Sequence, residues 1–215
     1  MPIENLERRI IELDQPFSRV KLSGTGRFTI AQGERPSVSI LADRRIVDKV
    51  VVRIMGEILY VYLERDVYDL DKIFFEPSYE IVTAAVVTVD VSGELIGTLS
   101  GYGDRLRLIL SGLTNISAEK LSTARLDAEV SGSSRLTISG TADLAALDLS
   151  GSSMISAMDL KASRGRVVVR GSAKASVFVT EYLDAAAGGA GRIIYRGHPQ
   201  VVQRQSGFGR VIADG

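Results

Sequence analysis

The chain contains no cysteine and no tryptophan, and it has a single histidine among its 215 residues. The absence of cysteine excludes disulfides, thiolate metal sites and cysteine catalysis, and it leaves the redox compartment undecided. The 26 basic and 26 acidic side chains cancel, so the chain has no net field that would attract a nucleic acid or an anionic membrane surface. We therefore expect no nucleic-acid partner.

Long apolar segments are also missing. The longest mainly apolar run, EIVTAAVVTVDV at residues 80–91, is too short to span a bilayer as a helix and is rich in β-branched residues. It predicts a buried strand, and the sequence predicts no transmembrane segment. The first residues place Glu4 and Glu7 where a signal peptide would carry a basic region, so we expect no export signal in the chain as given. The cellular location stays undecided at this point.

In place of these features the sequence has a repeat of glycine. Seven glycines, five of them preceded by serine, recur with successive gaps of 19, 20, 19, 20, 18 and 18 residues. They are Gly93, Gly112, Gly132, Gly151, Gly171, Gly189 and Gly207. Periods near this length are typical of solenoids in which each repeat forms one coil. We expect each glycine to form a corner, because glycine tolerates the positive φ that sharp turns need.

Apolar and polar residues alternate between the predicted corners. In RLRLIL, residues 105–110, leucine occupies every second position, and in LDAEV, residues 126–130, Leu126, Ala128 and Val130 do the same. A period of two indicates a strand with one buried face. Short strands and regular corners together predict an all-β protein: a parallel β-helix, or solenoid, with about 18–20 residues per coil and right-handed winding.

We predict one β-helix domain over residues 1–215, with a cap at 1–16, the first coils at 17–91 and the regular Ser-Gly coils at 92–215. About nineteen residues per coil would give about eleven coils and a rod about 50 Å long. Unpaired backbone groups at the ends of such a rod need a cap. ENLERRIIEL would cap one end as a strand, whereas SGFGRVIADG offers no obvious cap, so we expect self-association into a homo-oligomer.

The densest group of carboxylates lies in ERDVYDLDKIFFE, residues 64–76. It comprises Glu64, Asp66, Asp69, Asp71 and Glu76. Such clusters can bind calcium or serve as general acid and base, but a solvated loop is the simpler interpretation. His198 precedes a proline in a predicted turn and lacks a serine or cysteine partner of recognisable motif. We therefore assign no catalytic residue, no metal site and no cofactor.

Four aromatic residues are the best candidates for contact with a ligand or partner: Tyr60, Tyr62, Tyr68 and Phe178. Aromatic rings stack on sugars and anchor protein partners, although packing within the fold is the simpler interpretation. We interpret the outward charges, such as Arg107 of RLRLIL, as serving solubility.

Three stretches carry a resemblance to a known family. They are the repeats such as VSGSSRLTISG, the N-terminal FSRVKLSGTGRFTIAQGERPSVSILADRRIVDKVVVRIMGEILYVYLE, and the ending GAGRIIYRGHPQVVQRQSGFGRVI. Over about residues 17–212, the chain resembles the bacterial family named "putative auto-transporter adhesin, head GIN domain", whose function is unknown. The resemblance implies a β-helix, no assigned catalytic residue, and export or a cell-envelope location. The chain departs from the family's Ser-Gly-Ser-Gly-Asp corners, because Ser133-Ser134 and Ser172-Ala173 follow the glycine here.

These observations predict a non-enzymatic adhesin or cell-envelope binding module, with a glycan or a cell-surface protein as its partner. Two alternatives stay open. One is a carbohydrate-active enzyme of the polysaccharide lyase or hydrolase type, which rests on analogy of fold alone. The other is a structural scaffold that assembles through its coil ends.

Overall fold

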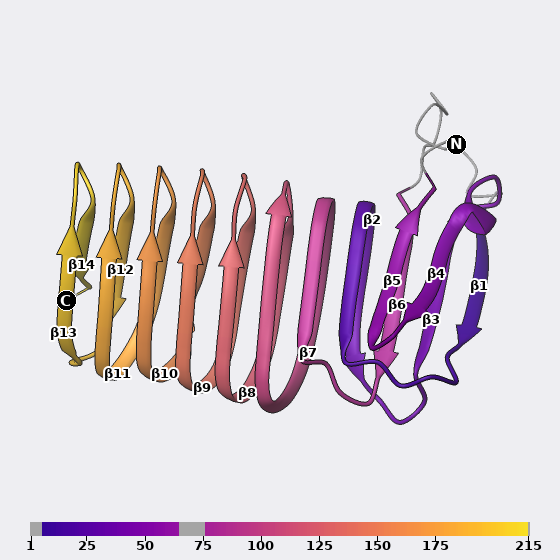
Figure 1. The fold of residues 1–215 in the computed structure, drawn as a ribbon, viewed down its shortest axis with the longest axis horizontal. Coiled ribbons are helices and arrows are strands. Elements are labelled where there is room, and N and C mark those ends of the chain that lie inside the picture. The colour runs from indigo at the N-terminus through magenta and orange to yellow at the C-terminus, as the bar shows by residue number, and fades with distance from the viewer. Residues whose placement is uncertain (1–5, 65–75, 215) are drawn as a thin grey trace.

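The coils form a parallel β-solenoid of about six turns. This is seen in a computed structural model, which describes residues 6–64 and 76–214. Within these residues the strands join in one 14-stranded sheet that winds along the rod (Figure 1). No helix in the described part of the chain is long and apolar enough to cross a membrane.

The strands fall into an N-terminal group and a group of regular coils. The N-terminal group contains β1 (Leu6–Glu12), β2 (Arg19–Gln32), β3 (Ser37–Asp43), the short 3-10 helix η1 (Val47–Lys49), β4 (Val50–Met55), β5 (Ile58–Leu63) and β6 (Ser78–Thr83). The regular coils contain β7 (Thr88–Gly112), β8 (Asn115–Val130), β9 (Arg135–Leu149), β10 (Met154–Val169), β11 (Lys174–Ala187), β12 (Arg192–Arg196), β13 (Gln200–Gln205) and β14 (Arg210–Ala213).

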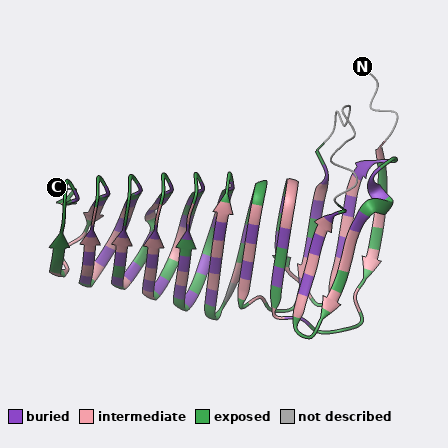
Figure 2. Ribbon diagram, turned by 45° about the horizontal axis from the view of Figure 1, so that its top comes forward, coloured by how far each residue is buried: buried purple, intermediate pink, exposed green. Residues whose placement is uncertain are grey.

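The core runs through the middle of the coils and is built from stacked aliphatic side chains. Leu110 of β7 lies in register with Val130, then with Leu149, Val169 and Ala187 of the following coils, and all five side chains are buried. Burial of a leucine or valine side chain contributes about 1.5–3 kcal/mol. The alternation of buried and less buried residues predicted from the period of two is visible along the strands β8 to β11 in Figure 2. Neighbouring coils therefore supply each other's core.

A column of glycines forms one edge of the rod. All seven glycines that recur in the sequence have a positive φ, and Gly24, which the spacing did not single out, begins the same column in register with Gly93. A Cβ atom on Gly132 would lie 2.7 Å from the carbonyl oxygen of Gly112. The amide nitrogen after each corner donates to the glycine carbonyl one coil earlier, as in Ser133 N to Gly112 O at 2.9 Å. The corner therefore requires glycine for its φ and for its close stacking.

The serines of the repeated SGSS stretches satisfy backbone carbonyls at these corners. Ser134 Oγ donates to Gly112 O at 3.2 Å. Ser153 Oγ, one coil later, donates to Ser150 O at 2.8 Å and to Val130 O at 3.1 Å. Both serines are buried, where an unpaired hydroxyl or carbonyl would be costly. The carbonyls of Gly112 and Val130 also accept from the backbone amides of Ser133 and Ser150, so the serine hydroxyls find their own partners at the corner and add a second hydrogen bond to these carbonyls.

The coil number predicted from the sequence, about eleven, is wrong, because the N-terminal strands do not all wind as coils. Strand β2 pairs in parallel with β7 on one side and with β5 and β6 on the other. Beyond them, β4 pairs antiparallel with β5, and β3 pairs antiparallel with β6. Gly56, with φ +61°, helps to form the tight turn that joins β4 to β5. Such a short turn can join only antiparallel neighbours.

Residues 80–91 and the first strand, β1, were both predicted as strands from the sequence. The run 80–91, predicted as one buried strand, is divided between β6 and β7, with a break at residues 84–87. Strand β1 pairs antiparallel with β3 over seven residues, so the charged first segment forms a strand at the end of the sheet. This covers one edge of β3 and removes an open row of backbone groups there.

The opposite end of the rod is different. In the described residues, β13 pairs only with β11, and β14 pairs only with β12. Apolar side chains lie exposed on and beside these strands, among them Val202, Ile212 and Phe208, which is 80% exposed. Each of these two strands therefore presents one unpaired edge.

The corner column makes a testable prediction for Gly132. Replacing Gly132 by valine forces a branched side chain into a positive φ and against the Gly112 carbonyl, so we expect a loss of about 1–3 kcal/mol in unfolding free energy. Gly56→Val is the matched control, because Gly56 shares the positive φ while a Cβ there would meet nothing within 4 Å. Chemical denaturation measures both variants. Equal losses would show that stacking of the glycines contributes nothing.

A second prediction concerns Asp43 at the end of β3. Arg45 donates to its carboxylate from Nε at 2.9 Å and from Nη2 at 2.7 Å, and its backbone nitrogen donates at 2.9 Å. These hydrogen bonds lower the pKa of Asp43 from 3.8 to about 2. A lowered pKa adds stability above the unfolded-state value of about 4, and this stability is lost as the pH falls toward 2.

We therefore expect Asp43→Asn to unfold more easily than the unsubstituted chain at pH 7. The difference should shrink between pH 4 and pH 2, measured by urea unfolding at each pH. Asp48→Asn is the control, since Asp48 is exposed and forms no ion pair within the described residues. If the difference in unfolding free energy between Asp43→Asn and the unsubstituted chain stayed constant down to pH 2, the lowered pKa of Asp43 would be contradicted.

Candidate functional site

The predicted aromatic contacts do not meet in one site. Tyr60 and Tyr62 lie on β5, and the Arg53 guanidinium carbon of β4 lies 5.8 Å and 5.6 Å from their ring centroids. Phe178 lies on β11 among the C-terminal coils, with the Arg196 guanidinium carbon 4.6 Å from its ring centroid. Tyr68 lies outside the described residues. Each described ring already has a cationic partner from a neighbouring strand, which favours a packing role for these rings.

The carboxylates of residues 64–76 are described only at the two ends of that segment. Glu64 pairs with Lys49 at 3.8 Å, and Glu76 pairs with Arg27 at 3.8 Å. Asp66, Asp69 and Asp71 lie outside the described residues. His198 lies exposed in the turn between β12 and β13. No cluster of three or more His, Cys, Asp or Glu side chains suited to a metal occurs in the part of the chain that the structure describes.

The outward charges of neighbouring coils form ion pairs with one another, here called the charged ladder: Arg105, Arg107, Arg125, Asp127 and Glu129. The Asp127 carboxylate forms an ion pair with Arg125 of its own strand at 2.8 Å and a second one with Arg105 of the preceding coil at 3.0 Å. One step along, Arg107 pairs with Glu129 at 2.6 Å. Hydrogen bonds from Arg125 lower the pKa of Asp127, so this carboxylate stays ionised at neutral pH and is not suited to act as a general acid. This ladder does not provide a free charged surface.

A groove of about 600 Å³ follows another side of the rod. We call it the hydroxyl groove, and it is lined by Gly103, Asp104, Ser122, Thr123, Ala124, Thr141, Ala142, Asp143, Lys161 and Ser163. Successive coils supply these residues in register, because Ser122 pairs with Thr141 and Thr141 with Lys161. The side chains of Ser122, Thr141 and Lys161 are exposed, whereas those of Thr123 and Ala142, which also line the groove, are buried.

The lining determines what the hydroxyl groove can do. Ser122 and Thr141 supply hydroxyl groups that both donate and accept hydrogen bonds. The carboxylates of Asp104 and Asp143 accept hydrogen bonds, and the Lys161 ammonium donates them. Charges of both signs give no strong preference for an anion or a cation. The lining therefore suits an uncharged molecule with many hydroxyl groups.

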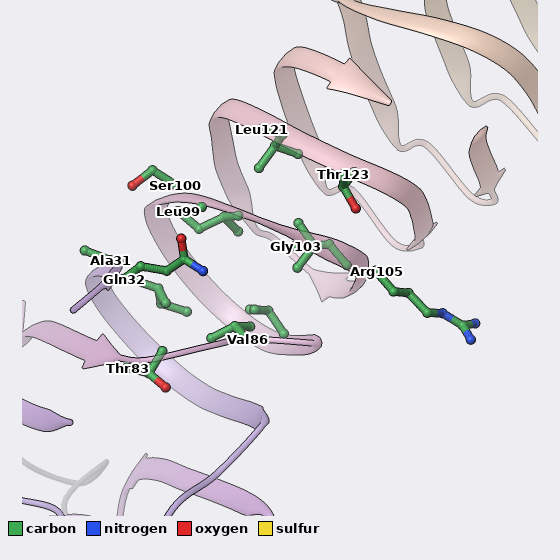
Figure 3. Close-up of a pocket in the computed structure, with 14 residues that line it drawn as sticks. Ala31, Gln32, Thr83, Val86, Leu99, Ser100, Gly103, Arg105, Leu121 and Thr123 are labelled. Carbon is green, nitrogen blue, oxygen red and sulfur yellow. The ribbon is translucent and has the colours of Figure 1, made fainter. Parts of the chain in front are cut away.

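An apolar cavity of about 30 Å³ adjoins this groove, and Figure 3 shows the side chains that line the cavity. Gly103 and Thr123 line both spaces. The other cavity-lining residues are Ile30, Ala31, Gln32, Thr83, Val86, Val89, Leu99, Ser100, Gly101, Arg105, Leu106 and Leu121. The Arg105 side chain extends away from the cavity in Figure 3.

Sequence reasoning did not single out the groove or the cavity. The glycines of GYGDRL, residues 101–106, were the one signal, since they interrupt the alternation that continues in the next coil. Their effect becomes visible only when Gly103 is placed in register with Thr123.

Comparison with known proteins gives the same fold over nearly the whole chain. The family model described as "Putative auto-transporter adhesin, head GIN domain" matches residues 16–199. The comparison with curated proteins gives no match.

Three solved structures are similar to the chain. The structure of a putative adhesin from Bacteroides fragilis has a TM-score of 0.87 and 21% identity, and the match covers 99% of this chain and 97% of that one. A putative adhesin from Parabacteroides merdae has a TM-score of 0.75 and 22% identity, with 99% and 98% covered. A putative lipid binding protein from Parabacteroides distasonis has a TM-score of 0.75 and 19% identity, with the same coverage. At these identities the likeness shows the fold.

Proposed function

We propose that this chain, which belongs to the family named "putative auto-transporter adhesin, head GIN domain", is a non-catalytic binding module that holds a glycan in its hydroxyl groove. The observation that carries the proposal is the lining of the groove, where hydroxyls, carboxylates and one ammonium come from consecutive coils. Sugars present many hydroxyl groups that pair with such a mixture of donors and acceptors. The adhesin names of the family and of two neighbours support a role in binding.

The direction of the groove favours an extended ligand. Its lining residues come from four successive levels of the solenoid, at Gly103, Thr123, Ala142 and the level of Lys161. Parallel strands repeat about every 4.8 Å, so four levels span about 14 Å. That length accommodates several consecutive sugar units and would align them with the rod axis.

The spacing of the carboxylates favours binding over hydrolysis. Asp104 and Asp143 each follow a residue of the same register column, Gly103 and Ala142, and lie two levels apart. Two steps place their backbones about 10 Å apart. This backbone spacing is wider than the carboxyl separation of about 5–5.5 Å in retaining glycosidases, and it slightly exceeds the carboxyl separation of about 6.5–9.5 Å in inverting ones. We therefore place binding ahead of a carbohydrate-active enzyme.

The proposed module would act outside the cell and would also contact a second copy of itself. A binding module of an adhesin-like family would act at the cell surface or after export. The unpaired edges of β13 and β14, with Val202 and Ile212 exposed, would let a second copy of the chain pair with this end. Backbone pairing across such edges is a common route to association.

Glycan binding is tested with a panel of soluble oligosaccharides by calorimetry, with reducing ends assayed in parallel. We expect binding without turnover, and we expect Thr141→Ala combined with Lys161→Met to weaken binding about tenfold through two lost hydrogen bonds. Arg135→Gln is the matched control, because it removes an exposed positive charge outside the groove lining. An absence of binding across the panel would overturn the proposal, and release of new reducing ends would replace it with the enzyme.

Self-association is tested by sedimentation over a range of protein concentrations. We expect Val202→Lys combined with Ile212→Lys to shift the distribution toward monomer, because lysine on an edge strand opposes pairing. Leu113→Lys, at an exposed corner away from β13 and β14, should leave it unchanged. A monomer at every concentration for the unsubstituted chain would contradict this part of the proposal.

A further inference from the structure

We infer that the apolar cavity beside the hydroxyl groove binds the acetyl group of an N-acetylated sugar, an inference that rests on the proposed binding of a glycan in the groove. The two spaces share Gly103 and Thr123. A sugar lying in the groove could therefore direct one substituent into the cavity. The cavity would then select among glycans that the groove by itself binds equally well.

The walls of the cavity are mainly aliphatic. Leu99 and Leu106 come from β7, Leu121 comes from β8, and Ile30 comes from β2. Val86, in the break between β6 and β7, completes this side. Figure 3 shows Leu99, Leu121 and Val86 around the same space. Burial of a methyl group among such side chains is favourable, at about 0.8 kcal/mol for each carbon.

The cavity exists because one level of the repeat lacks a side chain. Gly103, Thr123, Ala142, Ala162 and Val179 occupy equivalent positions in successive coils. The side chains of the last four are buried and fill the interior of their coils. Gly103 is itself exposed, and a Cβ atom there would meet nothing within 4 Å, so this level is open between the cavity and the groove.

Size and polarity decide which group fits. A volume of about 30 Å³ exceeds the roughly 10–15 Å³ that one water needs, but an apolar space gives water few of the two to four polar partners that hold it in place. A methyl group fits such a volume. Gln32 also lines the cavity, and its side-chain amide lies toward this space in Figure 3, near an amide attached to the methyl. An acetamido group combines these two requirements.

The test compares pairs of oligosaccharides that differ only in an acetamido group or a hydroxyl at the same carbon, such as chitotetraose and cellotetraose, together with galacto-configured pairs. We expect the N-acetylated member of a pair to bind at least about fourfold more tightly, which is the value of one buried methyl. Calorimetry on the full chain measures both members.

Gly103→Thr is the decisive variant, because it copies the equivalent residue Thr123 and fills the opening. Gly103 is not among the glycines with positive φ, so a side chain there causes no backbone strain. We expect the preference for the N-acetylated member to disappear in Gly103→Thr, while the hydroxyl member still binds. Gly103→Ala adds only one carbon and should reduce the preference in part, with thermal unfolding confirming that both variants fold. Arg135→Gln, an exposed position outside the lining of both the groove and the cavity, should leave both the binding and the preference intact.

The outcomes separate this inference from the proposed function. Equal binding of the two members would overturn the acetyl pocket while leaving glycan binding in place. A preference that persists in Gly103→Thr would also overturn it, because the acetyl group would then be bound elsewhere. If the protein bound neither member of any pair on the panel, the proposed function and this inference would both be overturned.

Discussion

Close stacking of glycine on glycine is the constraint on which the regular coils depend. Each corner places its Cα carbon against the carbonyl oxygen of the corner below, and the next amide donates to that same oxygen, as at Gly112 and Gly132. A side chain at this point would push the coils apart and would break hydrogen bonds along both adjoining strands. The strands can keep the spacing of a parallel sheet only if this column contains glycine.

Because the corners and the buried faces fix the path of the chain, the outer faces are free to vary from coil to coil. One face uses this freedom for ion pairs between coils, such as Arg107 with Glu129. Another face carries small polar residues and forms the hydroxyl groove. The site therefore depends on the regular stacking beneath it, which brings Ser122, Thr141 and Lys161 into one column although about twenty residues separate them in the chain.

The candidate site also depends on a local departure from the repeat. Gly103 lacks the side chain that Thr123 and Ala142 carry at the same position, and the break at residues 84–87 brings Val86 beside the resulting space. A repeat in which every level were filled would present a groove without a cavity. Departures of this kind give a repetitive fold its specificity, since each level can be altered without changing the path of the others.

The sequence by itself determined the coil. The gaps of 18–20 residues between glycines and the period of two in RLRLIL required short strands, one buried face and recurring corners. It did not determine strand direction at β3 and β4, because an antiparallel strand and a parallel strand share the same alternation. Nor did it place Arg53 against Tyr60, or Gly103 and Leu121 around one cavity. Those contacts join different strands, and only the register between coils, set by packing of the whole rod, brings them together.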